Sequence, residues 1–487
     1  MTPNWMIEGG LAMLVVWPLL WGAWTLVLPV RLAAMMGVVG SVCLGTWVWT
    51  LAPQTLALGG WAPPLGLGWR LDAVSQALIA LVAWVGAWVS LYAWWDHALS
   101  PRFWGLWLGA WAAMNALLMT ADVFHLYVTL ELLGVAAVAM VALTPGWAGA
   151  NAAFRYLLVS LSGSMLFLLG VALLYGRYGV LDMVALAQAM QLDGASALAL
   201  ALMTVGLMAK TAVLPLHAWL PHAHAQAQTA VSALLSALVV KAGLYALARL
   251  WLEVFAPITT GPNNQAWWLW AVVGSVAIFW GGYQALRASH LKALVAWSTV
   301  AQIGGLVLAL GLMLQASGSL SKTAMTALWW AWVWLVAAHA LAKAAWFLAA
   351  GTVKKRAGTP ELAQMALALQ HSPVSVFAFA LGLVSLAGLP LSMGFLGKWW
   401  WLALAWEHQA WWFMGVSLLG SLLTLAYGWR ILNLAVSGKQ GAKQGPKALL
   451  PPPSLQTVPV RLDAVALVLA ALSVFGALGS HWFWEMG

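Results

Sequence analysis

The chain is dominated by apolar runs that are each about as long as a membrane's hydrocarbon core is thick. A spanning helix needs about 20 mainly apolar residues, and about 14 runs in the 487-residue sequence fit that requirement. They are centred near residues 20, 41, 83, 112, 133, 163, 208, 240, 276, 303, 336, 387, 422 and 472. Only 7% of the residues are charged, so the chain cannot cover a water-facing surface. These features predict an all-α integral membrane protein and exclude soluble enzymes, disordered proteins and nucleic-acid binders.

The basic residues are divided unevenly between alternate loops. With the N-terminus placed outside, one side of the membrane collects Arg31, Arg102, Arg287, Lys292, Lys354, Lys355, Arg356, Lys439, Lys443, Lys447 and Arg461. The other side holds only Arg70, Arg177 and Lys322. Because cytoplasmic loops are rich in Lys and Arg, this bias predicts that both termini lie outside a bacterial-type plasma membrane, which requires an even number of spans. The bias also accounts for the net charge of +9 without a nucleic-acid partner.

Two apolar runs are interrupted by proline, in "VLPLH" at 213–217 and "GLPLS" at 388–392. A proline inside a span breaks the helix, and such breaks are tolerated only where freed carbonyls meet protein or water. Corresponding breaks in two halves indicate an inverted-repeat transporter. Residues 180–192 fit a short amphipathic helix at the membrane interface. We therefore expect N-terminal helices over 1–102, repeats over 103–256 and 266–436, a cytoplasmic linker over 437–461 and a last helix over 462–487.

Ionisable residues deep in the apolar runs are the candidate functional residues, because a charge in the bilayer is costly. Glu131 is the one acid in the middle of such a run, and the deep bases are Lys210, Lys241, His339, Lys343 and Lys398. One acid and a row of bases fit a proton path. No nucleophile with a paired base is evident, so we expect a transporter subunit rather than an enzyme. The alternative for any single lysine is that it only holds a backbone carbonyl or extends its ammonium to the interface.

Two of these placements indicate a mechanism. A carboxylate near a buried lysine favours its protonated form, so moving the Glu131 charge away from Lys210 would release a proton. His339 and Lys343 are four residues apart and therefore share one helix face, along which a proton can pass with water.

No cofactor or metal is expected in this chain. The single cysteine, Cys43, can form neither an internal disulfide nor a thiolate-ligated iron–sulfur cluster. His217, His222 and His224 follow the first proline break, and their spacing would allow chelation, but no nearby acid or cysteine completes a metal site. We interpret them as a proton entrance or as a cap of the broken helix.

The same regions resemble a known family. "KTAVLPLHAWLPHAHAQAQTAVSALLSALVVKAGLY" (210–245) resembles the segment shared by antiporter-like subunits of respiratory complex I, membrane-bound hydrogenases and Mrp-type sodium/proton antiporters. "HLKALVAWSTVAQIGG" (290–305) is similar to the tenth-helix signature of that family, and Glu131 falls where its fifth-helix glutamate is expected. The resemblance covers about residues 70–435. The segment 388–431, which includes Lys398, is most similar to the D subunit of Mrp antiporters.

The resemblance implies about 14 transmembrane helices with two inverted five-helix repeats and broken helices. It also implies that Glu131 and Lys210 form a coupling pair, that Lys241 is a central relay, and that His339 or Lys343 connects to Lys398 as the far-side gate. The expected partners are other membrane subunits, protons, Na⁺ and the lipid bilayer. Three alternatives remain open: the proton-pumping arm of a redox complex, the membrane subunit of an inorganic-carbon uptake complex, and a membrane scaffold.

Overall fold

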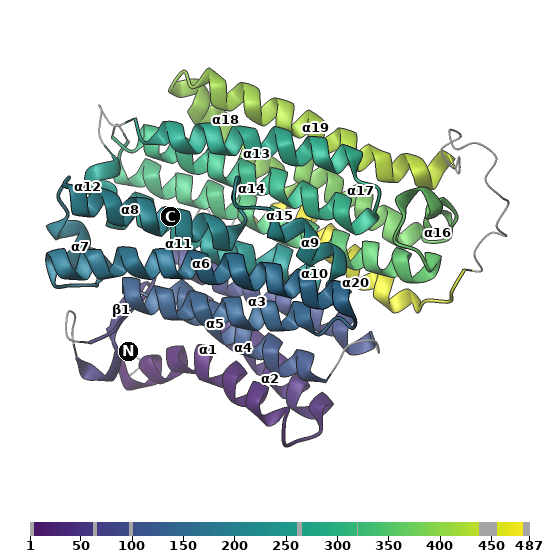
Figure 1. Ribbon diagram of the computed structural model, residues 1–487, viewed down its shortest axis with the longest axis horizontal. Coiled ribbons are helices and arrows are strands. Elements are labelled where there is room, and N and C mark those ends of the chain that lie inside the picture. The colour runs from purple at the N-terminus through teal and green to yellow at the C-terminus, as the bar shows by residue number, and fades with distance from the viewer. Residues whose placement is uncertain are drawn as a thin grey trace.

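The computed structural model describes residues 4–61, 66–96, 101–260, 265–318, 320–437 and 455–480. Its helices lie side by side with their axes roughly aligned, from α1 and α2 at one edge to α18 and α19 at the other (Figure 1). The first part contains α1 (Asn4–Trp24), α2 (Val30–Trp47), α3 (Ala73–Trp95), α4 (Arg102–Met119), α5 (Val123–Ala142), α6 (Trp147–Tyr178) and α7 (Met183–Ala189).

The middle of the chain holds a long helix with two π-helical turns. It is preceded by α8 (Gly194–Thr211) and α9 (Trp219–Gln226), and it comprises α10 (Thr229–Leu234), the π turn η3 (Leu235–Val239), α11 (Val240–Arg249) and the π turn η4 (Leu250–Val254). The remaining helices are α12 (Ala256–Thr259), α13 (Trp267–Arg287), α14 (Leu291–Ala316), α15 (Lys322–Ala357), α16 (Ala366–Gln370), α17 (Pro373–Ala387), α18 (Met393–Glu407), α19 (Trp411–Ser437) and α20 (Val460–Phe475).

The helical fold class predicted from the apolar runs is confirmed, since each predicted centre falls on a helix. Within the described residues, eleven helical stretches are long and apolar enough to cross a membrane. The predicted centres at 20, 112 and 387 lie on α1, α4 and α17, which do not meet both criteria. Helix α17 is only 15 residues long because a break separates it from α18. The side of the membrane on which each loop lies stays a prediction.

Both predicted proline breaks are present. Helix α8 ends at Thr211 and α9 begins at Trp219, with Ala212 in the left-handed region at a φ of 54°. Helix α17 ends at Ala387 and α18 begins at Met393. Between them Gly388 has a φ of 75°, a conformation that glycine adopts without strain. The repeat boundaries at 103–256 and 266–436 stay a prediction.

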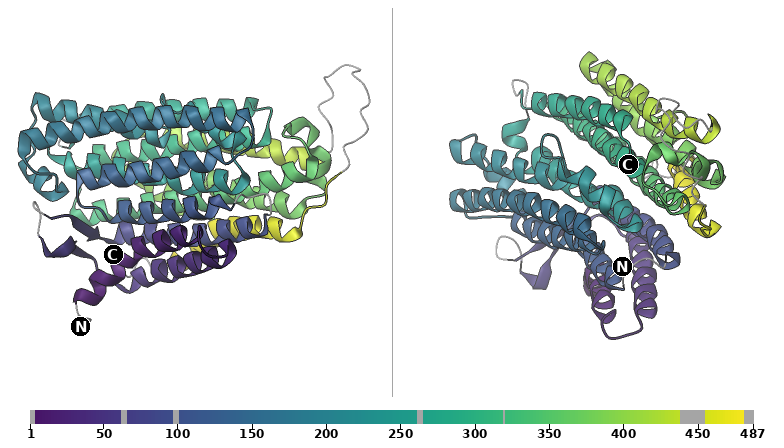
Figure 2. Two further views of the ribbon diagram at one scale, coloured as in Figure 1. Left: turned by 60° about the horizontal axis from the view of Figure 1, so that its bottom comes forward. Right: turned by 45° about the vertical axis from the view of Figure 1, so that its right-hand side comes forward.

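A small β-hairpin was not expected from the sequence. Strands β1 (Gln54–Ala57) and β2 (Gly68–Leu71) pair antiparallel, with Gln54 opposite Leu71, and lie at one end of the helices (Figure 2). Its strands have only four residues each, too few for a clear alternation of apolar and polar side chains. The sequence between the second and third apolar runs therefore gave no recognisable strand signal. The amphipathic segment predicted over 180–192 does form a short helix, α7. Most of the predicted linker, residues 438–454, lies outside the described residues.

Pairs of glycines allow two helix pairs to approach closely. A β-carbon on Gly163 of α6 would lie 2.8 Å from the Gly206 carbonyl oxygen of α8, and one on Gly206 would lie 2.4 Å from that of Gly163. On α13 and α14, a β-carbon on Gly274 would lie 2.7 Å from the carbonyl oxygen of Gly304. Small residues at such crossings let the backbones of membrane helices touch, which is a main source of their packing energy.

We expect Gly163→Ala to destabilise the protein, because its methyl group would meet the backbone of α8. Forcing one extra carbon into a well-packed crossing costs about 1–3 kcal/mol. The measurement is the midpoint of thermal unfolding in mild detergent. Gly176→Ala is the matched control on the same helix, where a β-carbon meets nothing within 4 Å, and should leave the midpoint unchanged or raise it. Equal effects of the two changes would contradict the role of the crossing.

Candidate functional site

The predicted pair, Glu131 and Lys210, forms an ion pair between α5 and α8. Lys210 Nζ lies 2.7 Å from Glu131 Oε1 and also donates to the Leu130 carbonyl oxygen at 3.3 Å. The hydroxyl of Ser164, on α6, donates to the same glutamate oxygen. The Lys210 side chain is 7% exposed and that of Glu131 is 23% exposed, so the lysine is enclosed while the carboxylate reaches the surface of the chain.

A glycine on α5 leaves the space that Lys210 occupies. A β-carbon at Gly134 would lie 3.3 Å from Lys210 Nζ and 3.0 Å from the hydroxyl oxygen of Ser160. Ser160 accepts a further hydrogen bond from Lys210, at 3.4 Å. The ammonium therefore sits among a carboxylate, a carbonyl and a hydroxyl, which together offset the cost of burying its charge.

Lys241 is the first buried base beyond this pair. It lies at the start of α11, directly after the π turn η3, and its ammonium donates to the carbonyl oxygen of Ser236 within that turn. Its side chain is almost fully buried. A π turn shifts the backbone hydrogen bonds by one residue, and such turns often occur at functional sites.

Lys343 and His339 lie on one continuous helix, α15, as their spacing predicted. The Lys343 ammonium donates to the hydroxyl of Ser298 and, at 3.3 Å, to the carbonyl oxygen of Val295, both on α14. It also lies 5.1 Å from the centre of the Trp346 ring. Lys343 is near enough to Lys241 for the two charges to repel each other. No hydrogen bond directly joins these two lysines among the described residues.

His339 and Lys398 line one cavity of about 80 Å³ between α14, α15, α18 and α19. Neither ring nitrogen of His339 has a hydrogen-bond partner among the described residues. Gln302 and Thr424 also line the cavity and are joined by a hydrogen bond of 3.1 Å. A cavity of this volume with several polar walls has room for several water molecules. The structure thus brings His339, rather than Lys343, to the same cavity as Lys398.

The second helix break supplies the partners of Lys398. Its ammonium donates to the carbonyl oxygens of Leu386 and Ala387, each at 3.0 Å, at the C-terminal end of α17. In an unbroken helix the amide of residue 390 would bond to the Leu386 carbonyl, but Pro390 has no N–H to donate. Ser421 accepts a third hydrogen bond at 2.9 Å. The negative end of the helix dipole at the C-terminus of α17 further stabilises the Lys398 ammonium.

The histidines after the first break do not converge. His224 is fully buried and stacks on Phe347 with ring centres 4.6 Å apart, whereas the His217 ring contacts the carbonyl oxygen of Pro215 and the side of Trp297. Within the part of the chain that the structure describes, no group of three or more His, Cys, Asp or Glu side chains is placed to hold a metal.

Lys292 is a buried base that sequence reasoning assigned only to the charge bias of the loops. The structure places it in the first turn of α14, 6% exposed, where it donates to the carbonyl oxygen of Ala227 at 2.7 Å and to Ser232. Its position at the start of the tenth apolar run made it resemble a loop residue. The serines beside these charges, Ser164, Ser236 and Ser298, were also missed, because a serine in an apolar run carries no signal of its partner.

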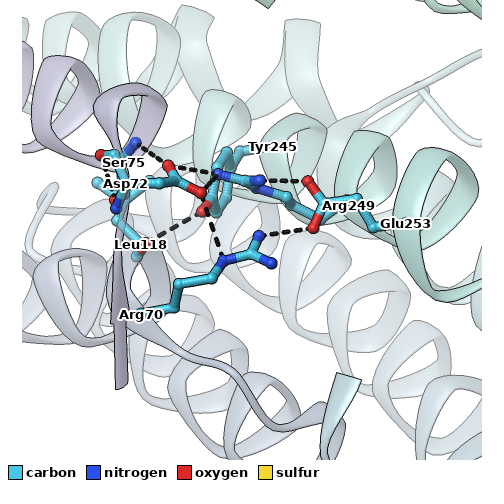
Figure 3. A network of polar contacts seen from close by, with 7 residues as sticks. All are labelled: Arg70, Asp72, Ser75, Leu118, Tyr245, Arg249 and Glu253. Atoms are coloured by element: carbon cyan, nitrogen blue, oxygen red, sulfur yellow. Dashed lines mark hydrogen bonds and ion pairs between the residues drawn. The ribbon is translucent and has the colours of Figure 1, made fainter. Parts of the chain in front are cut away.

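A second polar network holds the far end of the helix that carries Lys241 (Figure 3). Arg249, eight residues after Lys241, donates to both carboxylate oxygens of Asp72 at 2.7 and 2.5 Å and forms an ion pair with Glu253. Arg70 forms ion pairs with the same two acids: its Nε lies 3.3 Å from Asp72 Oδ2, and its Nη2 lies 2.6 Å from Glu253 Oε2. The network thereby ties α11 to the N-terminus of α3 and to strand β2.

The Asp72 carboxyl also caps α3, accepting a hydrogen bond of 2.9 Å from the backbone amide of Ser75. Burial raises the pKa of this carboxyl, but the Arg249 and Arg70 guanidiniums and the Ser75 amide outweigh burial and hold the pKa below its ordinary value of 3.8. Figure 3 shows Tyr245 beside Arg249, with its hydroxyl donating to the Leu118 carbonyl oxygen at 3.0 Å.

We expect Asp72→Asn to lower the thermal midpoint at pH 7. Because the folded-state pKa of Asp72 lies below its unfolded-state value, the charged carboxylate stabilises the fold above about pH 4, and this contribution is lost as pH falls through the folded-state pKa. The difference in midpoint between wild type and variant should therefore shrink as the pH is lowered below 3.8. A difference that stays constant from pH 7 to pH 3 would contradict the electrostatic account.

Comparisons with known proteins identify the family and the fold to which this chain is similar. The family described as "NADH:quinone oxidoreductase/Mrp antiporter, TM" matches residues 120–424. The N subunit of the NADH-quinone oxidoreductase of Desulforudis audaxviator is 32% identical over 91% of this chain and 88% of its own length. The D subunit of the Na⁺/H⁺ antiporter of Bacillus subtilis is 28% identical over 92% of this chain and 88% of its own. A chain of the Mrp complex from Dietzia sp. superposes with a TM-score of 0.82 at 24% identity, covering 99% of this chain and 96% of that one, which establishes the shared fold.

Proposed function

This chain belongs to the NADH:quinone oxidoreductase/Mrp antiporter transmembrane family, and from that premise we propose that it is the proton-translocating subunit of a multisubunit cation/proton antiporter. It is an antiporter-like subunit of the Mrp or complex I type. The observation that carries the proposal is the Glu131–Lys210 ion pair, which joins the one carboxylate in the middle of a span to a buried lysine.

The ion pair is the element that controls the proton. While Glu131 faces Lys210, the ammonium form is favoured, and when the carboxylate is neutralised or drawn away, the buried ammonium loses its countercharge and releases a proton. The exposed share of Glu131 makes it accessible to a charge on a neighbouring membrane subunit. A conformational change in a partner can thereby act on Lys210 through the glutamate.

The change in charge at the Glu131–Lys210 pair acts next on Lys241 and Lys343. Both ammonium groups are bonded to neutral oxygens, so their protonation depends on the charges around them. Because they lie within repulsive range of each other, protonation of one disfavours protonation of the other. This repulsion passes the effect from the first broken helix toward the second, from α8 through α11 and α15 to α18, helices that pack pairwise through α11 on α8, the π turn η3 on α15, and α15 on α18.

The cavity at His339 and Lys398 is the far end of the path. Its five polar wall residues and its volume allow water to connect the His339 ring, which has no hydrogen-bond partner among the described residues, with Lys398, and a neutral imidazole has one nitrogen that accepts a proton and one that donates it. Lys398 then releases its proton on the far side when repelled by an incoming charge. We assign Na⁺ movement to neighbouring subunits, because Na⁺ needs several oxygen ligands and this chain offers one carboxylate deep in its spans.

A second candidate is the proton-pumping subunit of a redox complex. The 32% identity with the N subunit of NADH-quinone oxidoreductase favours it. In that function the same lysines would move protons, and the redox reaction would lie in other subunits. The two candidates differ in what drives the Glu131–Lys210 pair, not in the path through this chain.

We expect Glu131→Gln and Lys210→Met each to reduce proton flux in vesicles carrying the complex to the level of empty vesicles, because each change removes one half of the ion pair. Flux is followed by a pH-sensitive dye after a cation pulse. Glu407→Gln, at an exposed acid on α18, is the matched control and should retain wild-type flux. Assembly is checked by co-purification of the partner subunits. Wild-type flux in both pair variants with the complex intact would overturn the proposal.

The composition of the purified complex distinguishes the two candidates. For the antiporter we expect mass spectrometry to find only membrane subunits, and we expect a Na⁺ or K⁺ pulse alone to drive proton movement in vesicles. Co-purification of iron–sulfur proteins, with proton movement only upon addition of a reductant and quinone, would replace the antiporter with the redox-driven pump.

A further inference from the structure

An apolar groove of about 490 Å³ lies between α2 and α3. Helix α2 lies at the opposite edge of the molecule from α18 and α19 (Figure 1). Five of the groove's twelve lining residues are tryptophans: Trp84, Trp88, Trp94, Trp95 and Trp104. Met35 and Val39 of α2 form the opposite wall and are 45% and 54% exposed, so the groove is open to the surroundings. None of the residues assigned to the proton path lines it.

Two arginines stand at one end of the groove. The Arg31 guanidinium lies 5.8 Å from the centre of the Trp94 ring, and that of Arg461, on α20, lies 5.5 Å from the centre of the Trp95 ring. Both arginines are exposed. The two side chains therefore place two positive charges beside the paired tryptophans, where α2 begins and α3 ends.

These charges have no carboxylate partner among the described residues. The two acids that adjoin this end of the groove in sequence are already engaged: Asp96, directly after Trp95, pairs with Lys355, and Asp463, two residues after Arg461, pairs with Arg356 at 3.1 Å. An anion from outside the chain would complete the site. Tryptophan and arginine together are typical of the headgroup level of a membrane.

The groove is about as long as the hydrocarbon part of one lipid leaflet is thick. Along α3, the distance from Trp95 to Trp84 is about 16 Å at 1.5 Å per residue, close to half of a hydrocarbon core of about 30 Å. An acyl chain that starts at the arginines and runs along the tryptophans would thus end near the membrane centre. The arginines also lie on the side that the charge bias assigns to the cytoplasm, where anionic lipids are concentrated.

We propose that this groove binds one anionic glycerophospholipid, with its phosphate between Arg31 and Arg461 and an acyl chain along Trp94, Trp88 and Trp84. The bound lipid fills the space between α2 and α3 and ties α20 to both helices through its headgroup. The site holds a structural lipid and is independent of the proton path.

Native mass spectrometry of the complex, purified from nanodiscs of phosphatidylglycerol and phosphatidylcholine, tests the headgroup contacts. Arg31→Ala with Arg461→Ala should reduce the retained phosphatidylglycerol about fivefold for each arginine removed. Arg287→Ala is the matched control, because this arginine also lies over an aromatic ring, 5.5 Å from the centre of the Tyr283 ring, but that ring does not line the groove. Equal retention in the double variant and the control would overturn the proposal.

A photo-crosslinking amino acid at Met35 tests the occupant directly in the intact complex. Crosslinked chain that gains the mass of a phosphatidylglycerol molecule supports the proposal. Crosslinking to another protein subunit would overturn it, because the groove would then be a subunit interface. The same experiment with the crosslinker at Phe377, an exposed apolar position away from the groove, should give no such defined lipid mass.

Discussion

The structure depends on one constraint: an ammonium group inside a membrane protein must find oxygen acceptors, because water is scarce and an unpartnered buried charge costs several kcal/mol. Four buried lysines and the half-buried Lys398 each donate to at least one backbone carbonyl. These carbonyls belong to Leu130 for Lys210, Ser236 for Lys241, Ala227 for Lys292, Val295 for Lys343, and Leu386 and Ala387 for Lys398. Of these lysines, only Lys210 has a carboxylate partner among the described residues.

Irregular helix geometry supplies several of these acceptors. Pro390 leaves the Leu386 carbonyl without its usual donor, and Lys398 takes that place. At the first break, the Trp219 indole donates to the carbonyl oxygen of Ala209 at 2.8 Å, so a tryptophan satisfies a carbonyl that the broken helix leaves free. The π turn before Lys241 presents the Ser236 carbonyl. Neutral acceptors keep a lysine buried without fixing its charge, which is the property that a proton relay needs.

The sequence was sufficient for features that depend on local pattern or on strong energetic cost. Apolar run length predicted the helices, proline predicted the breaks, and the rarity of deep charges singled out Glu131 and Lys210, although they are 79 residues apart. Features that arise from tertiary packing could not be predicted. The sequence does not show that Ser298 faces Lys343, that Lys292 turns inward, or that Asp72 meets Arg249 across 177 residues. The Arg249 and Glu253 spacing of four was a visible signal of a helical ion pair, but not of its link to α3.

The central claim is that the enclosed lysines act as one path, and Lys343 is the member that joins its two halves. The most direct measurement is proton flux through vesicles containing the complex with Lys343→Met, which nearly keeps the length of the side chain but removes its charge. The account predicts flux at the level of empty vesicles, while Lys354→Met, near the end of the same helix, retains wild-type flux. Wild-type flux in an assembled Lys343→Met complex would contradict the account, because protons would then cross without the link between the two broken helices.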